Sequence, residues 1–191
     1  MILIVGLGNP GTNYVNTRHN IGASWVAGLC KKYNISLQNN SKLNANIAVI
    51  NKDIYCMVSN SYMNHSGFSV QKCCHYYKIS VTDLLVIHDD LALQPGDIRL
   101  KLSGGHGGHN GLRHIIEQLQ SNDFKRLRIG IGHPQIKEQV TDYVLDVPSK
   151  QEQLMIKIAT ENSWQIIPEL LANNWQKIMQ FLHTSQNAGE I

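Results

Sequence analysis

The sequence predicts a single α/β domain with a mixed, mostly parallel, twisted sheet and helices on both faces. Residues 2–7 and 84–88 form short apolar runs, which are typical of strands buried on both faces of a sheet. Residues 21–33 place apolar side chains at helical spacing. Two strand-like runs, 45–50 and 54–59, have a turn sequence between them and predict a β-hairpin. A hairpin requires antiparallel strands, so the sheet is mixed.

The middle of the chain continues with a helix, a strand, a second helix and a further strand. The first helix runs to about Tyr77, with Asn64 or Ser66 as its N-cap. Residues 97–102 alternate apolar with basic side chains, which predicts a strand that packs on one face. The glycine-rich loop 103–108 opens a helix over about 110–120, and residues 127–131 form the next strand. The apolar face of that second helix carries Leu112, Ile115, Ile116 and Leu119.

The C-terminal part is helical in pattern. From Ser149 onward the helical spacing begins with Leu154 and Ile158, and Pro168 should kink or break the helix. A last short helix, covering the sheet, contains Trp175, Ile178, Met179 and Leu182. We expect one domain over residues 1–185 and a polar, frayed tail at 186–191.

The composition indicates a soluble protein of the reducing cytoplasm. The N-terminus lacks the basic segment of a signal peptide, and no apolar stretch approaches the ~20 residues that span a bilayer. The four cysteines form no CxxC pair, so we expect reduced thiols packed in the core. We see no constellation of metal ligands and predict neither a metal nor a cofactor. We also expect no membrane binding, and a monomer.

The loop after the first predicted strand is the first candidate for function. Ligands in α/β sheets gather outside the carboxyl ends of strands, which is where Asn9, Tyr14 and His19 are expected. The glycines of residues 6–11 match the spacing of the dinucleotide fingerprint. In that fingerprint, however, the glycines open directly into a helix, and an acidic residue ~20 positions on binds the ribose. Here the helix starts only at about residue 21, and no acidic residue precedes Asp53, which argues against nucleotide binding.

Five stretches together resemble one known family. GLGNPGTNYVNTRHNIG resembles the opening signature of bacterial peptidyl-tRNA hydrolases, and YMNHSG, HDDL, GGHGGHNGLR and RLRIGIGHP match the same family in the same order. The resemblance spans about residues 3–182. It implies hydrolysis of the ester bond between a peptide and the 3′-terminal ribose of tRNA, which releases free tRNA and peptide.

The resemblance also implies a general-base mechanism. His19 would take a proton from water, for which a histidine pKa near ~6.5 is suitable at neutral pH. Asp89, which matches the catalytic aspartate of the family, would bond the other ring nitrogen and fix the tautomer. From the residues alone, two adjacent carboxylates after a strand favour a solvated turn. The family usually has His-Asp-Glu here, so Asp90 is a departure, and residues 91–96 lack its second Asp and paired prolines. The chain has no G-x-S-x-G elbow, which argues against an acyl-enzyme serine hydrolase.

Asparagine side chains both donate and accept hydrogen bonds, so they can bind the backbone of a peptide of any sequence. By resemblance, Asn9 and Asn64 would hold the peptide backbone near the ester, and one asparagine could stabilise the oxyanion. Asn110 would hold the nucleic-acid end of the substrate or its water. Met63 would form a wall of the cleft, and Tyr14 would shape it.

A basic face points to a phosphate-bearing partner. The net charge is only +3, but residues 99–128 contain six basic and two acidic residues. By resemblance, Lys101 and Arg128 would clamp a tRNA phosphate, with Arg99 and His109 as neighbours. Phosphate contacts give affinity without base specificity, which suits an enzyme that accepts many tRNAs. Two rival hypotheses remain open: an RNA-binding protein without catalysis that uses this face, and a nucleotide-dependent oxidoreductase.

Overall fold

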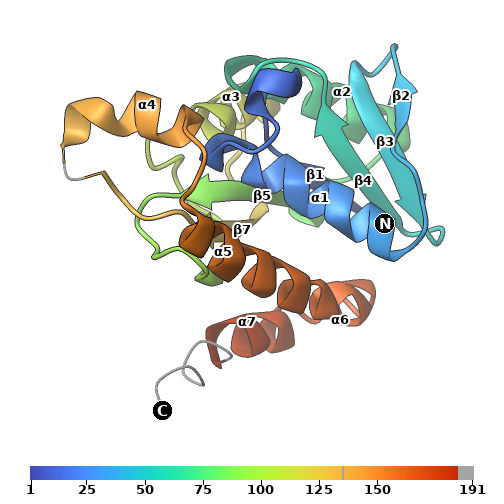
Figure 1. Cartoon of the computed structure of the whole chain (residues 1–191). Coiled ribbons are helices and arrows are strands. Elements are labelled where there is room, and N and C mark those ends of the chain that lie inside the picture. Colours follow the sequence, from blue (N-terminus) through green and yellow to red (C-terminus); the bar gives the residue numbers. More distant parts are fainter. Residues whose placement is uncertain (135, 185–191) are drawn as a thin grey trace.

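A seven-stranded mixed sheet forms the centre of the molecule (Figure 1). The computed structural model describes residues 1–134 and 136–184, so the predicted tail at 186–191 lies outside the described residues. The strand order is β2-β3-β4-β1-β5-β7-β6. The strands are β1 (Ile2–Gly6), β2 (Gln38–Asn40), β3 (Ala45–Ile50), β4 (Ile54–Ser59), β5 (Leu84–Asp90), β6 (Ile98–Lys101) and β7 (Lys125–Gly130).

The sheet confirms the predicted mixed α/β class. The four central strands β4, β1, β5 and β7 are parallel, whereas β2, β3 and β6 pair in antiparallel fashion at the two sides. The predicted hairpin is β3 and β4, and Asn51 in its turn has a φ of 49°. The short strand β2 was not predicted, because its residues are polar and carry no apolar alternation.

Helices cover both faces of the sheet. They are α1 (Ile21–Lys32), α2 (Ser66–Tyr77), α3 (Asn110–Leu119), α4 (Val140–Leu145), α5 (Lys150–Ser163), α6 (Ile167–Leu171) and α7 (Trp175–Thr184). One core joins α1 and the C-terminal helices α5–α7 to one face of the sheet, and the other joins α2 and α3 to the opposite face. Apolar side chains alternate between these cores along β1, which explains why this strand is apolar throughout.

Glycines at the end of β1 and in the first turn of α1 permit close packing. A Cβ atom on Gly6 would collide with the backbone of Gly22 in α1, and a Cβ on Gly22 would collide with the carbonyl of Ile87 in β5. Helix α1 therefore lies directly against β1 and β5. This contact places the turn before α1 at the carboxyl end of β5. It gives Gly6 a structural reason other than nucleotide binding, and a Cβ on Gly8 would likewise collide with Ala23 of α1.

One local prediction is wrong, and two features of the structure were not predicted. Neither Asn64 nor Ser66 caps α2, because a 3-10 turn, Met63–His65, leads into the helix and the cap position is His65. Leu154 and Ile158 are exposed, and Ile156 is the buried apolar residue of α5. Helix α4 was not expected at all.

The remaining C-terminal features fit the sequence. Ser149 and Glu152 form a capping box at the start of α5, a pattern visible in the sequence. Pro168 stands in the first turn of α6 after a 3-10 turn, Trp164–Ile166, has ended α5, so the predicted break is confirmed. None of the helices within residues 1–134 and 136–184 is both long and apolar enough to cross a membrane.

Candidate active site

A cleft of about 1090 Å³ opens at the carboxyl ends of β4, β1 and β5. The loop after β1, the turn Met63–His65, the glycine-rich loop before α3 and helix α4 form its walls. Most of the predicted site residues line it: Asn9, His19, Met63, Asn64, Asp89, Lys101, His109, Asn110 and Arg128. Tyr14 and Arg99 do not belong to this lining. Segments far apart in the sequence therefore meet at one sheet edge.

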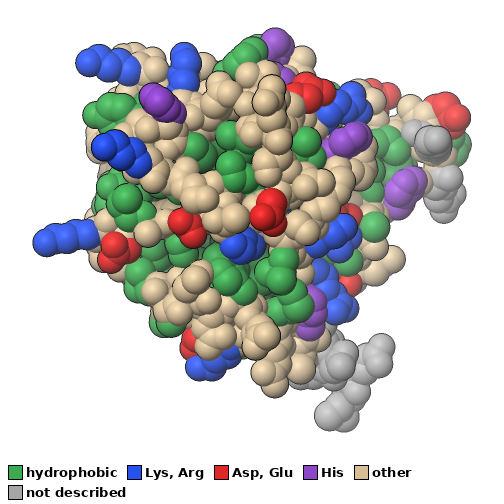
Figure 2. Space-filling model, turned by 180° about the vertical axis from the view of Figure 1, so that it is seen from behind, with side chains coloured by type: hydrophobic (Ala, Val, Ile, Leu, Met, Phe, Trp, Pro, Cys, Tyr) green, Lys and Arg blue, Asp and Glu red, His purple; other side chains and the backbone are tan. Residues whose placement is uncertain are grey.

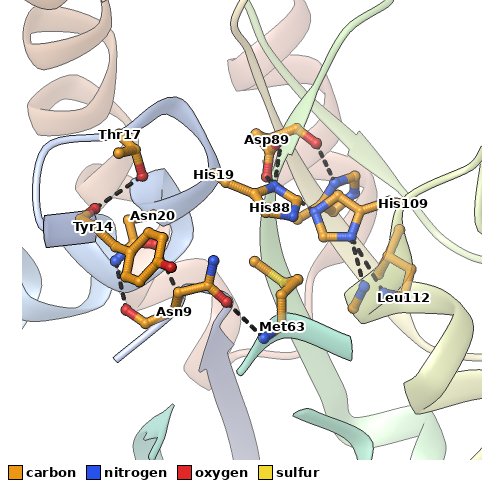
Figure 3. Close-up of polar contacts among 11 residues, drawn as sticks. Asn9, Tyr14, Thr17, His19, Asn20, Met63, His88, Asp89, His109 and Leu112 are labelled. Carbon is orange, nitrogen blue, oxygen red and sulfur yellow. Dashed lines mark hydrogen bonds and ion pairs between the residues drawn. The ribbon is translucent and has the colours of Figure 1, made fainter. Parts of the chain in front are cut away.

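His19 and Asp89 form a buried hydrogen-bonded pair in this cleft (Figure 3). His19 lies in the 3-10 turn Arg18–Asn20, and its Nδ1 is 3.0 Å from each carboxylate oxygen of Asp89. A carboxylate only accepts hydrogen bonds, so Nδ1 carries the proton and donates it. Nε2 is then an unprotonated acceptor, and no residue in the described part of the chain bonds to it.

The environment of the pair keeps Asp89 ionised and raises the basicity of His19. Burial alone would lower the pKa of His19, but the charge of Asp89 and its hydrogen bond outweigh burial and raise the pKa above 6.5. Burial would raise the pKa of Asp89, but the electrostatic interactions and hydrogen bonds with His19 and His109 hold this pKa well below the usual range. The carboxylate is therefore a permanent acceptor near neutral pH.

His109 is a second partner of Asp89. Its Nε2 lies 3.0 Å from Oδ1 of Asp89, and its Nδ1 accepts from the backbone N–H groups of Gly111 and Leu112 at the start of α3. These contacts assign a neutral ring with the proton on Nε2. Both ring nitrogens are thus engaged within the protein. The sequence suggested a phosphate neighbour, and no pattern of spacing signals the contact with Asp89.

His88 closes the back of the cluster. It is buried, and its Nδ1 donates to the carbonyl oxygen of Asp89 over 2.6 Å. Burial and the neighbouring His109 lower its pKa to about 3, so the ring is neutral at physiological pH. His19 is therefore the histidine of this cluster whose contacts favour the charged form.

Ligand atoms of His19, Asp89 and His109 lie within 4.8 Å of one another, a spacing that a metal ion could bridge. The same nitrogens already donate to the carboxylate, so the observed contacts describe a hydrogen-bonded triad. The absence of a metal remains a prediction.

Asn9 presents one free donor group, its side-chain amide nitrogen, to the cleft. Its Oδ1 accepts from the backbone N–H of Met63 at 2.7 Å, and Asn20 bonds both backbone polar groups of Asn9 at 2.8 and 2.9 Å (Figure 3). Because Oδ1 accepts, the other side-chain atom is the amide nitrogen. No described residue bonds to this Nδ2, which leaves two N–H donors for a ligand.

The other predicted cleft residues differ in exposure. Met63 is buried, whereas Asn64 and Asn110 are exposed and have side chains without a described hydrogen bond. Tyr14 lies outside the cleft, and its ring meets Tyr62 edge-on at 6.2 Å. Tyr62 does line the cleft, and the carbonyl of Tyr14 accepts hydrogen bonds from Thr17, just before the turn that carries His19.

Basic side chains occupy the opposite flank, along β6 and β7. Lys101 pairs with Arg126 and Arg99 with Arg128 in the antiparallel register, so all four lie on one face of the sheet. Nε of Arg128 donates to Asp90 at 2.6 Å, and its two Nη atoms have no hydrogen bond to a described residue. Burial by itself would raise the pKa of Asp90, but the hydrogen bonds from Arg128 and from the backbone of Ala92, together with the charge of Arg128, hold this pKa below its usual value. In Figure 2, Lys, Arg and His side chains are spaced along one side of the surface.

Arg126 has a different role from its neighbours. It is 2% exposed, and its guanidinium donates to the carbonyls of Gly104, Gly105 and Asn122. Burial, and then the charge of Arg128, lower its pKa. Arg126 thus fixes the glycine-rich loop that ends at His109. The sequence could not distinguish this buried arginine from a surface one.

Arg18 connects the His19 turn to α4, the wall of the cleft that was not predicted. Its guanidinium donates to the carbonyls of Tyr143, Asp146 and Val147 and pairs with Glu152 at 3.1 Å. The guanidinium also lies 4.0 Å from the centre of the Tyr143 ring. These contacts hold the C-terminal end of α4 against the turn that carries His19.

Comparisons with known proteins agree with one another. The family model described as "Peptidyl-tRNA hydrolase" matches residues 3–189. A peptidyl-tRNA hydrolase of Coxiella burnetii (strain RSA 331 / Henzerling II) is 47% identical over 182 residues, covering 95% of this chain and 97% of the relative. One from Nitrosomonas eutropha is 46% identical over 187 residues, with 96% of each chain covered. The crystal structure of peptidyl-tRNA hydrolase from Acinetobacter baumannii superimposes with a TM-score of 0.91 at 40% identity, covering 96% of this chain and 95% of that one.

Proposed function

The chain belongs to the peptidyl-tRNA hydrolase family and is an ester hydrolase that acts on peptidyl-tRNA, and from this premise we propose that His19 and Asp89 drive the cleavage by activating water. The observation that carries the proposal is the buried pair with its 3.0 Å contacts, which leaves Nε2 of His19 as a free base beside the cleft. Release of peptide from peptidyl-tRNA, measured with the wild-type chain and with His19→Ala, tests it.

The proposed reaction has two steps. A water molecule attacks the ester carbonyl carbon while Nε2 of His19 takes its proton, and the carbonyl oxygen becomes an oxyanion. The tetrahedral intermediate then collapses, the bond to the ribose oxygen breaks, and His19 returns the proton to that oxygen. Asp89 stabilises the imidazolium between these steps. We propose His109 as a positioning residue, because its fixed Nε2–H holds the Asp89 carboxylate.

The asparagines lie where they can hold the acyl part of the substrate. Asn9 offers its free Nδ2 next to Met63, and Asn64 and Asn110 present unbonded amides at the rim of the same cleft. We propose that Asn9 donates to the oxyanion or to the adjacent peptide carbonyl. Asn64 would bind the peptide backbone, and Asn110 the ribose end or its water. Tyr14 would support this side of the cleft through Tyr62.

Removing the free donor of Asn9 should slow catalysis strongly. Asn9→Asp keeps the oxygen that accepts from Met63 but replaces the donor by a negative charge, so we expect kcat to fall by ~10²-fold or more. Asn9→Ala removes both functions and should be at least as slow. Single-turnover release of peptide measures both variants. Wild-type rates in Asn9→Asp would contradict the donor role.

The basic flank would hold the nucleic acid. Lys101 and the open Nη atoms of Arg128 line the cleft and can receive a phosphate, and Asp90 would orient Arg128 through Nε. Arg99 lies opposite Arg128 on the next strand and would add positive charge. Arg126 also borders the cleft, but its guanidinium is buried and donates to loop carbonyls, so we propose that it supports the loop and does not bind the phosphate.

Loss of the Arg128 contact should weaken tRNA binding without changing the chemistry. In Arg128→Gln we expect KM to rise severalfold at ~0.1 M salt with kcat preserved, and the salt slope of binding to decrease by about one. Arg113→Gln is the matched control, since this arginine is exposed on α3 and does not line the cleft. Equal effects of the two substitutions would indicate a diffuse charge effect and would contradict the proposed clamp.

The two rival hypotheses predict different results. If the protein only bound RNA, its RNA binding would be unaffected by His19→Ala. An oxidoreductase would bind NAD(P), which a fluorescence titration detects, but two of the three glycines that suggested it, Gly6 and Gly8, lie against α1. We propose a monomer, because every group in the mechanism comes from one chain. We also propose one domain over residues 1–185 and a cytoplasmic location, where peptidyl-tRNA is formed. Analytical ultracentrifugation checks the oligomeric state.

A further inference from the structure

Three rings form a partly exposed cluster beside the cleft, outside the groups used in the mechanism. Phe68 on α2 is 47% exposed, and its ring meets His114 of α3 edge-on, with 4.6 Å between the centroids. His65, just before α2, lies 6.2 Å from Phe68 and 5.7 Å from His114. We call His65, Phe68 and His114 the ring cluster.

The ring cluster is held in a defined arrangement. Nδ1 of His114 accepts from the backbone N–H of Gly67 at 2.9 Å, which joins α3 to the first turn of α2. A Cβ on Gly67 would collide with the backbone of His114, so the glycine permits this close approach. The apolar ring of Phe68 is thus presented to solvent on a rigid support, and a ligand would not have to order it.

The ring cluster is continuous with the cleft. His65 itself lines the cleft, as do Asn64 and Tyr62. Phe68 follows about one helical turn later in α2, outside the cleft lining, and its ring lies beside that of His65. Tyr62 is also exposed, at 57%. An extended chain that leaves the reaction centre past Asn64 would therefore meet the rings of His65 and Phe68 next.

The order of the strands decides which part of the substrate passes this way. Along the sheet, β4 with its following turn lies on one side of β1 and β5, and the basic strands β7 and β6 lie on the other. If the tRNA is held at Lys101 and Arg128 and the ester reacts at His19, the peptide leaves toward the β4 side. This placement favours the peptide over the nucleotides.

We propose that the ring cluster binds an aromatic or apolar side chain of the peptide, upstream of the residue that is esterified to tRNA. This inference rests on the proposed function and adds a substrate preference to it. Edge-on and stacked ring contacts are individually modest, so we expect a preference of roughly three- to tenfold. The backbone contacts of the asparagines would still allow peptides without such a side chain.

The test uses one tRNA and one esterified residue throughout. The substrates are an N-acetylated single aminoacyl-tRNA, a hexapeptidyl-tRNA with five upstream glycines, and versions with one Phe at each upstream position. The enzymes are the wild type, Phe68→Ala and, as control, Tyr76→Ala, which removes an exposed ring near the other end of α2. Phe68→Leu serves as a second variant that keeps apolar contact, and thermal unfolding verifies that all variants fold.

At one upstream position, Phe should lower KM about three- to tenfold in the wild type and in Tyr76→Ala. Phe68→Ala should abolish this preference, and Phe68→Leu should retain part of it. All enzymes should cleave the N-acetylated aminoacyl-tRNA equally. The inference is overturned if no position shows a preference that depends on Phe68. It is also overturned if Phe68→Ala weakens every substrate alike, because the rings would then contact a tRNA base. Failure of the wild type to cleave any substrate would instead refute the proposed function.

Discussion

His19→Ala is expected to slow the release of peptide from peptidyl-tRNA by ~10²- to 10⁴-fold, the range that a positioned general base contributes. The substitution removes Nε2, the free acceptor in the His19–Asp89 pair, and no neighbouring group can replace it. Both ring nitrogens of His109 are engaged, and the pKa of His88 is lowered to about 3. Rapid-quench measurement under single-turnover conditions isolates the chemical step.

Two controls make this result specific. His75→Ala removes an exposed histidine on α2 that does not line the cleft, and it should leave the rate unchanged. Binding of deacylated tRNA should also survive in His19→Ala, because the proposed phosphate contacts lie on β6 and β7. A wild-type rate in His19→Ala would reject the mechanism, because another group would then have to activate the water.

The sequence predicted the frame of the site well because burial leaves a strong pattern there. β1 and most of β5 are apolar on both faces, and the bounds of the hairpin strands β3 and β4 agree with the predicted runs. The start of α1 at residue 21 also agrees, because Pro10 and the asparagines delay the helix. Polar residues at the ends of parallel strands then meet at one edge, as expected for His19 and Asp89.

Features that depend on tertiary contacts left no such pattern. The apolar residues of α5 do not separate into faces by type, and only packing in the core on this face of the sheet shows that Ile156 is covered while Leu154 is not. Arg126 and Arg128 are two residues apart with the same chemistry, yet one is buried against carbonyl groups and the other is partly exposed. The position of His109 next to Asp89 likewise depends on how α3 packs against the sheet.

Asp90 stands where the family usually has Glu, and the structure shows which groups the shorter side chain contacts. The shorter carboxylate in place of the usual Glu still reaches Arg128, with 2.6 Å between Oδ2 and Nε. Its other oxygen accepts from the backbone N–H of Ala92 at 2.9 Å. The adjacent carboxylates thus have separate partners: Asp89 bonds two histidines, and Asp90 bonds an arginine and the following loop.

Asp89→Asn should therefore be far more damaging than Asp90→Asn. Nε2–H of His109 and Nδ1–H of His19 both need an acceptor, and an amide offers only one oxygen in place of two. If the amide N–H instead donates to Nδ1 of His19, the ring takes the tautomer with the proton on Nε2 and cannot accept one from water. We expect the rate to fall by ~10⁴-fold, as for loss of the orienting aspartate in a catalytic triad.

The pH profile distinguishes this explanation from simple misfolding. Asp89 raises the pKa of His19 above 6.5, so in the wild type kcat/KM should fall on acidification through a value above 6.5 as the base becomes protonated. In Asp89→Asn the influences that raise the pKa are lost and burial remains, so the residual activity should have its acid limb at lower pH. Asp90→Asn should keep the wild-type limb and kcat while raising KM. An unchanged limb in Asp89→Asn, with a normal thermal unfolding curve, would contradict the coupling of this carboxylate to His19.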